Sequence, residues 1–294
     1  MDEQKKVGNG LVTVIMPAYR MGAFIGEALA SVGAQTYTNW EVIVVDDHGP
    51  EDGTSGIVAD FAKSRPGKRV EFIRHPENRG VSASRNTAIA AAQGEFLALL
   101  DPDDVWLAGH LANAMALFAK DAHLAVGTGP VVRFRSDASR NYEHPVQLAE
   151  WKKKYFPHSL AVHNFIQPSA TVLRHADVLS VGGFDCDPQL QHVEDYDLWI
   201  RLVKANARFA FYNIPSSRYR KHASAATADT ERMALLLERV NARHKEFIEA
   251  GRGRMLWRAL DDLELERTVR SGPVLKTLER LDAIAQRLVR RIIS

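Results

Sequence analysis

The stretch from Phe96 to Asp104 reads FLALLDPDD, an apolar run that ends abruptly in three carboxylates. A continuous apolar run is typical of a strand buried on both faces of a parallel sheet, and Pro102 ends the ladder because it has no N–H to donate. Ligands of open α/β sheets bind beyond the carboxyl ends of the strands. Three acids within four residues repel one another unless a cation holds them, and oxygen ligands of this kind suit Mg²⁺ or Mn²⁺, which usually meet a diphosphate as well. The alternative is a solvated turn that caps the next helix.

The composition is that of an ordinary globular protein, long enough for one large domain and an appendage. Of the 294 residues, 46% are hydrophobic and 25% are charged. The formal net charge of the chain is only +2, so its overall charge does not indicate nucleic acid binding. The single cysteine, Cys186, excludes an intramolecular disulfide and a cysteine-built zinc site. We expect a cytoplasmic protein, since residues 1–6 lack the apolar core of a signal peptide and no window resembles a membrane span.

Strand and helix patterns alternate four times in the first hundred residues. Apolar runs at 11–16, 41–45, 70–73 and 96–100 each precede or follow a segment of helical period. This alternation predicts an α/β fold with a mixed, mostly parallel sheet and helices on both faces. Pro17 is expected to end the first strand, and Asp46 and Asp47 follow the second.

The second half of the chain predicts further elements and a separate tail. Apolar runs predict strands at 126–134, 169–173 and 209–212. The polar, aromatic stretch 135–157 admits two interpretations, an excursion that lines a site or a solvated insertion. After about residue 225 the pattern becomes helical, with Gly251 and Gly253 expected to break the run at 230–249. We therefore predict an extension at 1–10, a catalytic domain at 11–225 and a helical region at 226–294.

Two common phosphate-binding loops are missing from the sequence. Neither Gly-x-Gly-x-x-Gly nor Gly-x-x-x-x-Gly-Lys occurs, which disfavours a dinucleotide dehydrogenase and a P-loop enzyme. A bound diphosphate would therefore be neutralised by a metal ion and by basic side chains. An acid at the end of a strand could instead accept a hydrogen bond from a base or a ribose hydroxyl.

Eight short motifs, in order and at fitting spacing, resemble those of the family 2 glycosyltransferases. They are Val14–Tyr19 (VIMPAY), Gln35–Tyr37 (QTY), Val44–Asp47 (VVDD), Asn78–Asn86 (NRGVSASRN), Leu100–Asp104 (LDPDD), Gly182–Asp185 (GGFD), Glu194–Trp199 (EDYDLW) and Tyr219–His222 (YRKH). Each motif alone is weak, but the series is specific and covers Val12 to His222. The resemblance implies a GT-A fold, an inverting mechanism and a nucleotide-diphosphate sugar donor.

The resemblance also implies a role for individual side chains on the nucleotide side. Six residues would bind the nucleotide: Pro17, Ala18, Tyr19, Asp47, Arg85 and Asp101. Tyr19 could stack on the base, Asp47 would accept a hydrogen bond from it, and Arg85 would reach the base or the phosphates. Taken alone, Tyr19 could be a surface aromatic residue, Asp47 a turn former and Arg85 a solvated charge.

On the metal and acceptor side, the resemblance implies that Asp103 ligates Mn²⁺ or Mg²⁺, with His222 approaching from the last loop. Asp195 would be the general base, with Glu194 beside it. The diphosphate or acceptor region would include Arg220, Gly183 and Trp199. Without this context, the acids at 194 and 195 could merely complement a helix dipole, and Trp199 would be a core residue.

These inferences predict an inverting, metal-dependent glycosyltransferase. Its donor would be a nucleotide-diphosphate sugar, most simply a UDP-sugar. Its acceptor would be a glycan or lipid-linked glycan in surface polysaccharide biosynthesis. Two alternatives are a non-catalytic module that binds nucleotide sugars or glycans, and a sugar nucleotidyltransferase.

The last helix places four arginines beside an apolar stripe: Arg280, Arg287, Arg290 and Arg291. This pattern admits packing on the catalytic domain, a homodimer, or peripheral contact with an anionic membrane surface at the inner face of the membrane.

Overall fold

The computed structural model describes residues 10–135, 142–146, 148–221 and 229–255. His222 and the arginine-bearing last helix lie outside the described residues. By internal contacts the chain divides into two units, one of Met1–Leu148 with Ile166–Val240 and one of Ala149–Phe165 with Asn241–Ser294. The catalytic domain at 11–225 and the helical region at 226–294 stay predictions.

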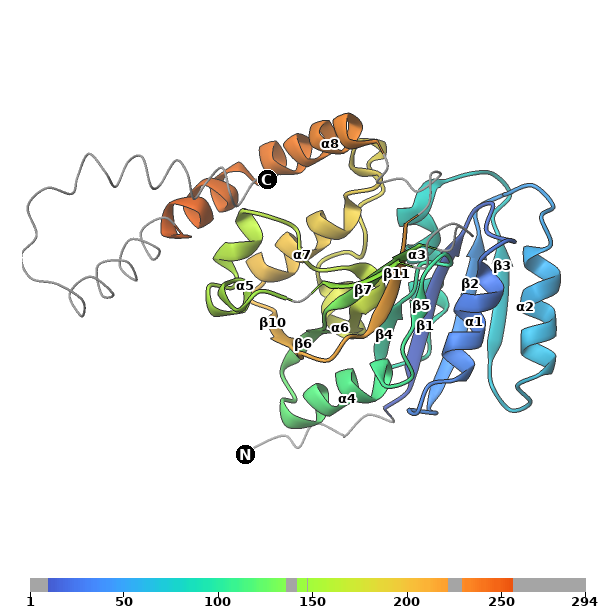
Figure 1. Ribbon diagram of the computed structural model, residues 1–294. Helices are drawn as coiled ribbons and strands as arrows, with labels where there is room; N and C mark the ends of the chain where they lie inside the picture. Colours follow the sequence, from blue (N-terminus) through green and yellow to red (C-terminus); the bar gives the residue numbers. More distant parts are fainter. Residues whose placement is uncertain (1–9, 136–141, 147, 222–228, 256–294) are drawn as a thin grey trace, which may run out of the picture. The chain divides into compact units, whose positions relative to one another are not determined.

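A seven-stranded sheet forms the centre of the first unit (Figure 1). Its order is β10 (Arg208–Phe211), β6 (Leu124–Thr128), β9 (Thr171–Arg174), β4 (Phe96–Leu99), β1 (Val12–Ala18), β2 (Trp40–Asp46) and β3 (Val70–Arg74). Only β9 runs antiparallel to its neighbours in this sheet, β4 and β6. The prediction of an α/β fold with a mixed, mostly parallel sheet is confirmed.

Strand β1 continues through Pro17, where the sequence predicted its end. The carbonyl of Ile15 accepts from Leu100 N on the β4 side, whereas the carbonyl of Ala18 accepts from Asp47 N on the β2 side. Successive residues of a strand point their backbone N–H and C=O groups to opposite neighbouring strands. Pro17 therefore points its nitrogen to the same side as Ile15, the β4 side. There the pairing of β1 with β4 ends at Ile15. Pro17 therefore removes no ladder hydrogen bond, and pairing with β2 continues to Ala18.

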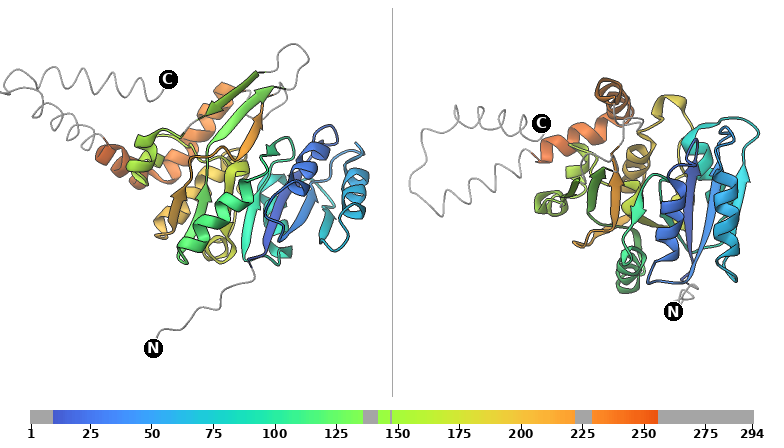
Figure 2. Two further views of the ribbon diagram at one scale, coloured as in Figure 1. Left: turned by 60° about the horizontal axis from the view of Figure 1, so that its bottom comes forward. Right: turned by 45° about the vertical axis from the view of Figure 1, so that its right-hand side comes forward.

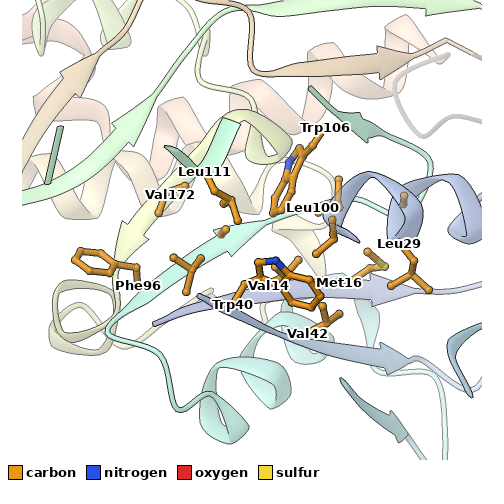
Figure 3. Packing of buried hydrophobic residues seen from close by; sticks show 14 of the residues in the cluster. Val14, Met16, Leu29, Trp40, Val42, Phe96, Leu100, Trp106, Leu111 and Val172 are labelled. Atoms are coloured by element: carbon orange, nitrogen blue, oxygen red, sulfur yellow. The ribbon is translucent and has the colours of Figure 1, made fainter. Parts of the chain in front are cut away.

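Helices cover both faces of this sheet (Figure 2). On one face α1 (Ile25–Gly33), α2 (Thr54–Lys63) and α4 (His110–Lys120) pack against alternate residues of β1, β2 and β4. Figure 3 shows this cluster, in which Met16 and Leu100 lie among the buried side chains. Helix α3 (Gly80–Ala91) packs against β1 and β2 with the opposite set of strand residues. The predicted alternation of strands and helices thus produces a two-faced apolar core.

A second, four-stranded sheet in the same unit has the order β5 (Val105–Trp106), β11 (Ser217–Arg220), β7 (Val131–Arg135) and β8 (Tyr142–Val146). The prediction of one strand over 126–134 is wrong, because the chain leaves the first sheet at Gly129 and Pro130 and enters the second. A Cβ at Gly129 would lie 2.2 Å from the ring of Tyr212, so only glycine fits at this crossing.

Two 3₁₀-helices and three α-helices complete the described framework of the first unit. They are η2 (Pro168–Ala170), α6 (His175–Ser180), η3 (Pro188–Leu190), α7 (Glu194–Lys204) and most of α8 (Thr230–Arg243).

The described part of the second unit contains α5 (Glu150–Lys154), η1 (His158–Ala161) and a helix over 245–255. The expected break at Gly251 and Gly253 is wrong, since the helix runs through both and the interruption falls at His244. A Cβ at Gly251 would lie 2.4 Å from the Cβ of Ala161, so the glycine permits a close helix contact. Within the described residues, no helix is long and apolar enough to cross a membrane.

Candidate active site

The three acids that follow β4 lie in different environments. The backbone N–H of Asp101 donates to Ser169 Oγ at 3.1 Å. The backbone N–H of Asp104 donates to the carbonyl of Asp101 at 3.0 Å, and this bond closes a tight turn. Asp104 is buried and accepts from Arg220 N at 2.9 Å. Burial, and then the charges of Asp103 and Asp101, raise the pKa of Asp104 well above its usual range. Asp101 keeps a side chain that is 29% exposed, so the turn leaves carboxylate oxygen accessible.

Arg220, predicted near the diphosphate, is buried and binds the turn that carries the acids Asp101, Asp103 and Asp104. Its Nε donates to the carbonyl of Asp103 at 2.7 Å, and its Nη2 pairs with Glu27 Oε2 at 2.6 Å. Together with the backbone bond to Asp104, these contacts attach β11 to the loop after β4. The structure therefore places Arg220 beside the predicted metal ligand, where it fixes the backbone of that ligand.

Arg85 connects the acidic turn to the start of α7. Its Nη2 donates to Asp101 Oδ1 at 2.7 Å, and its Nη1 donates to Glu194 Oε1 at 2.5 Å. The side chain is only 3% exposed. Burial lowers the pKa of Arg85, but the charges of Asp101, Glu194 and Asp195 raise it by more. The structure thus brings three predicted site acids, Asp101, Glu194 and Asp195, to the buried guanidinium of a fourth predicted site residue, Arg85.

The predicted general base lies in the first turn of α7. Asp195 is partly exposed, while its neighbour Glu194 is 4% exposed. Acids at a helix N-terminus are stabilised by the helix dipole, and here Arg85 adds a full positive charge. Glu194 Oε2 is buried with no hydrogen-bond partner among the described residues. The cluster therefore retains hydrogen-bonding capacity that the described residues do not use.

The predicted nucleotide-binding segment extends from the carboxyl end of β1. Pro17 and Ala18 are buried within the strand, and Tyr19 directly after it is 40% exposed. The guanidinium of Arg20 lies 5.2 Å from the centroid of the Tyr19 ring. Arg20 and His48 both have left-handed backbone angles, with φ of 59° and 58°. An exposed aromatic ring at this edge can stack on a planar base.

Asp47 is buried, and its carboxylate accepts hydrogen bonds from other residues of the chain. It accepts from His75 Nδ1 at 2.7 Å, from Arg79 N at 2.9 Å and from Gly80 N at 2.7 Å. His75 in turn contacts Thr87 Oγ1 through Nε2 at 2.9 Å. Asp47 therefore anchors the start of α3, the helix that carries Arg85. Sequence reasoning missed His75 and Ser169, because no local pattern indicates partners so distant in the chain.

Gly183 and Trp199 occupy packed positions. Gly183 has φ of +72°, and a Cβ there would lie 2.7 Å from Asn86 Oδ1, the atom that accepts from Phe184 N. Trp199 is fully buried and donates from Nε1 to the carbonyl of Ile166 at 3.3 Å. The glycine thus lets the Gly182–Asp185 turn pack on α3, and the tryptophan belongs to the core.

The acids after β4 fit a hard divalent cation that a ligand helps to hold. Among the residues that the structure describes, no group of three or more His, Cys, Asp or Glu side chains is arranged as a metal site. Mg²⁺ is commonly bound through one or two carboxylates together with substrate phosphates. Asp103 and the accessible oxygen of Asp101 supply that donor chemistry, so the chain's own ligand set suits a metal shared with a diphosphate.

The comparison with protein families identifies one model over much of the chain. The model for glycosyl transferase family 2 matches residues 13–181. A curated relative is "UDP-Glc:alpha-D-GlcNAc-diphosphoundecaprenol beta-1,3-glucosyltransferase WfgD" of Escherichia coli. It is 30% identical over 200 residues, which are 67% of this chain and 71% of that protein.

Solved structures show the same fold. The mannosyltransferase PcManGT from Pyrobaculum calidifontis, in complex with GDP-Man and Mn²⁺, aligns with a TM-score of 0.65 at 19% identity. That alignment covers 96% of this chain and 80% of that one. Residues 1–349 of TarS from S. aureus, in complex with UDP-GlcNAc, align with a TM-score of 0.59 at 21% identity over 76% of this chain and 65% of that one. The chain thus has the GT-A architecture of these glycosyltransferases.

Proposed function

Because the chain belongs to glycosyl transferase family 2, we propose that it transfers a sugar from a nucleotide-diphosphate donor to a hydroxyl group, with inversion at the anomeric carbon. The single observation that carries this proposal is the cluster around Arg85. There Asp101, from the end of β4, and Glu194, beside Asp195 at the start of α7, share one buried guanidinium. Arg85 thereby fixes Asp101, which we place beside the sugar donor, and the helix start that carries the proposed base Asp195.

In this mechanism the nucleotide base stacks on Tyr19, and Asp101 and Asp103 face the sugar and the diphosphate. Asp195 accepts the proton of the acceptor hydroxyl while that oxygen forms a bond to the anomeric carbon. The bond between this carbon and the diphosphate oxygen breaks, and its electron pair leaves with the nucleoside diphosphate. General base catalysis of this kind contributes typically ~10²–10⁴-fold to the rate.

Asp103 is the residue that would hold Mn²⁺ or Mg²⁺, with His222 as the predicted second ligand. Such an ion, when bound, supplies Lewis-acid stabilisation of the departing diphosphate. Arg220 supports this arrangement because it fixes the carbonyl of Asp103 and the carboxylate of Asp104.

We propose a UDP-sugar as donor and a glycan or lipid-linked glycan as acceptor, in surface polysaccharide biosynthesis. Support comes from the relative WfgD, named as an enzyme of UDP-Glc and a diphosphoundecaprenol-linked sugar, and from WcaA of Escherichia coli K12, named for colanic acid biosynthesis. The non-catalytic alternative would keep the nucleotide site and lose the base, whereas Glu194 and Asp195 are both present here.

The test is release of nucleoside diphosphate from UDP-, GDP- and dTDP-sugars with Mn²⁺, Mg²⁺ or EDTA. We expect turnover of one donor that requires metal and is lost in Asp103→Ala. The matched control is Asp60→Ala, which removes an exposed acid on α2 and should leave turnover unchanged. Pyrophosphate release from a nucleoside triphosphate and a sugar 1-phosphate, with no nucleoside diphosphate released from any sugar donor, would indicate a nucleotidyltransferase. Nucleotide binding without turnover on any acceptor would favour the binding module.

A further inference from the structure

The loop that follows β2 packs against the loop that follows β1 at the carboxyl edge of the first sheet. The two strands are neighbours and pair in register to their ends. A Cβ built at Gly49 would lie 3.2 Å from the backbone nitrogen of Arg20 and 3.7 Å from Cδ2 of Tyr19. The loop after β2 therefore adjoins the exposed ring on which we place the nucleotide base.

Hydrogen bonds fix the backbone of the loop after β2. The N–H of Gly49 donates to Asp46 Oδ1 at 2.9 Å, and the carbonyl of Gly49 accepts from Arg74 Nη2 at 2.7 Å. Further along the loop, Asp52 Oδ2 accepts from the N–H of Gly22 at 2.8 Å. A side chain carried between these contacts starts from a fixed backbone, and such preorganisation lowers the cost of binding a ligand.

The carboxylate of Asp47, which the sequence predicts to bind the base, is largely occupied by the chain itself. Oδ1 accepts from His75 Nδ1 and from the N–H of Arg79, and Oδ2 accepts from the N–H of Gly80. A carboxylate has about four acceptor sites, and Asp47 is only 3% exposed. A base with a hydrogen to donate therefore needs another acceptor at this edge of the sheet.

His48, the next residue, offers such an acceptor. Its side chain is exposed, and its Nδ1 lies 3.2 Å from the carbonyl oxygen of His75. A carbonyl oxygen can only accept, so Nδ1 carries the proton of the neutral ring and Nε2 keeps a lone pair. The two nitrogens lie on opposite sides of the ring. Because His75 follows β3, on the side of β2 away from β1, Nε2 points away from β3.

We propose that His48 selects the nucleobase, and that its Nε2 accepts the ring N–H of uracil, thymine or guanine while the base stacks on Tyr19. Cytosine and adenine have an unprotonated nitrogen at the corresponding ring position. Two acceptors that face each other both stay unpaired, and a site built to hydrogen-bond one group rejects an analogue that lacks it. This inference rests on the proposed function, whose donors it restricts to sugars carried on a base with a ring N–H.

The test is calorimetric titration of UDP, 3-methyl-UDP, GDP and 1-methyl-GDP, each with Mn²⁺, into the full chain. Each methyl group replaces the ring N–H. His48→Gly removes the ring, and glycine keeps the left-handed backbone angle, φ of 58°, without strain. His48→Asn also tolerates this angle and supplies an amide oxygen as acceptor. The matched control is His123→Gly, which removes an exposed histidine just before β6. Thermal melts check that the variants remain folded.

We expect methylation to weaken binding of the preferred nucleotide by at least about tenfold in the wild type and in His123→Gly. His48→Gly should bind the unmodified nucleotide about tenfold more weakly than the wild type does, and methylation should then change its affinity by less than about threefold. His48→Asn should lie between the wild type and His48→Gly, because its amide oxygen restores an acceptor.

An equal effect of methylation in the wild type and in His48→Gly would overturn the proposal, because another group would then bind the ring N–H. Unchanged affinity of His48→Gly for the unmodified nucleotide would also overturn it, since His48 would then only bound the pocket sterically. Either result would leave the proposed function intact. Failure of both UDP and GDP to bind the wild type would instead count against the proposed function and this inference together.

Discussion

Two buried clusters of carboxylate and arginine lie at opposite ends of the same sheet. At the amino end, Glu41 of β2 pairs with Arg69 at 2.8 Å. At the carboxyl end, Arg85 pairs with Asp101 and Glu194. The two clusters have similar chemistry, and they differ in how completely their hydrogen-bonding groups are used.

The amino-end cluster is saturated. Glu41 is 2% exposed and accepts from Thr13 Oγ1 at 2.5 Å, Gln93 N at 2.7 Å and Arg69 Nη1 at 2.8 Å. Burial raises the pKa of Glu41, but these hydrogen bonds outweigh it and the pKa is lowered. A carboxylate in this state contributes to stability and has little capacity left for a ligand.

The carboxyl-end cluster is not saturated. Glu194 Oε2 and Arg85 Nε are buried with no hydrogen-bond partner within the described part of the chain, and Asp101 is partly exposed. Unsatisfied buried polar groups cost about 1–3 kcal/mol each. Such a cost is expected where a substrate completes the cluster. The two clusters therefore differ in saturation more than in burial or charge, and the unsaturated cluster is the one that we propose binds substrate.

The largest effect is expected at Asp195. Asp195→Asn removes the proposed base and should lower kcat by ~10²–10⁴-fold, with thermal stability near that of the wild type. Steady-state release of nucleoside diphosphate in the presence of acceptor measures it. If Glu41→Gln lowered kcat as much as Asp195→Asn does, the proposed difference in role between the two clusters would be contradicted.

Arg85→Met should destabilise the fold by about 3–5 kcal/mol, because it leaves the buried Glu194 and the partly exposed Asp101 without their cation. Its counterpart at the amino end, Arg69→Met, removes a guanidinium that is 32% exposed and should cost about 1 kcal/mol. Urea unfolding at pH 7 measures both variants. Equal losses would show that the two clusters are equivalent.

Glu41→Gln should cost about 1–3 kcal/mol at pH 7, since the amide cannot accept all three hydrogen bonds. The pKa of Glu41 is lowered in the folded state, so its stabilisation is present above the unfolded pKa of about 4.3 and lost as pH falls through the folded pKa. The stability gap between wild type and variant should therefore shrink below about pH 4. A gap that stays constant from pH 7 to pH 3 would contradict this assignment.

A neutral buried pair sharpens the comparison further. His110 Nδ1 contacts Tyr212 Oη at 2.9 Å, and burial lowers the pKa of His110 to about 3. Below about pH 6.5 the unfolded state binds a proton that the folded state does not. The free energy of unfolding therefore decreases as the pH is lowered from about 6.5 to 3, by ~1.4 kcal/mol per pH unit. His110→Gln should show a shallower slope in urea titrations at pH 6 and pH 5. Parallel slopes would refute the buried neutral histidine.

Local patterns predicted the parts of the fold that depend on neighbouring residues. The apolar runs before Asp46 and Asp101 became β2 and β4, and the acids lie at the carboxyl edge as expected. Patterns failed where a distant partner decides the outcome. Strand β1 passes through Pro17 because its pairing with β4 has already ended at Ile15. The chain changes sheets at Gly129, where the ring of Tyr212, 83 positions away, leaves no room for a Cβ.

The candidate site shows the same limit. Its residue types could be named from motifs, but their partners could not. Asp101 and Glu194 lie 16 and 109 positions from Arg85, and His75 lies 28 positions from Asp47. Contacts over such separations are set by how the strands and helices assemble. The motifs therefore indicated Arg85 as a ligand-binding group, whereas the structure shows it bridging two acids.

The central claim, that the carboxyl end of the sheet binds a nucleoside diphosphate with a divalent metal, is tested most directly by calorimetric titration of UDP and GDP with Mn²⁺ into the wild type, Asp103→Asn and Glu41→Gln. We expect one nucleotide to bind the wild type and Glu41→Gln with equal affinity. We expect at least tenfold weaker binding of that nucleotide to Asp103→Asn. Absence of binding by either nucleotide, or equal binding to Asp103→Asn, would contradict it.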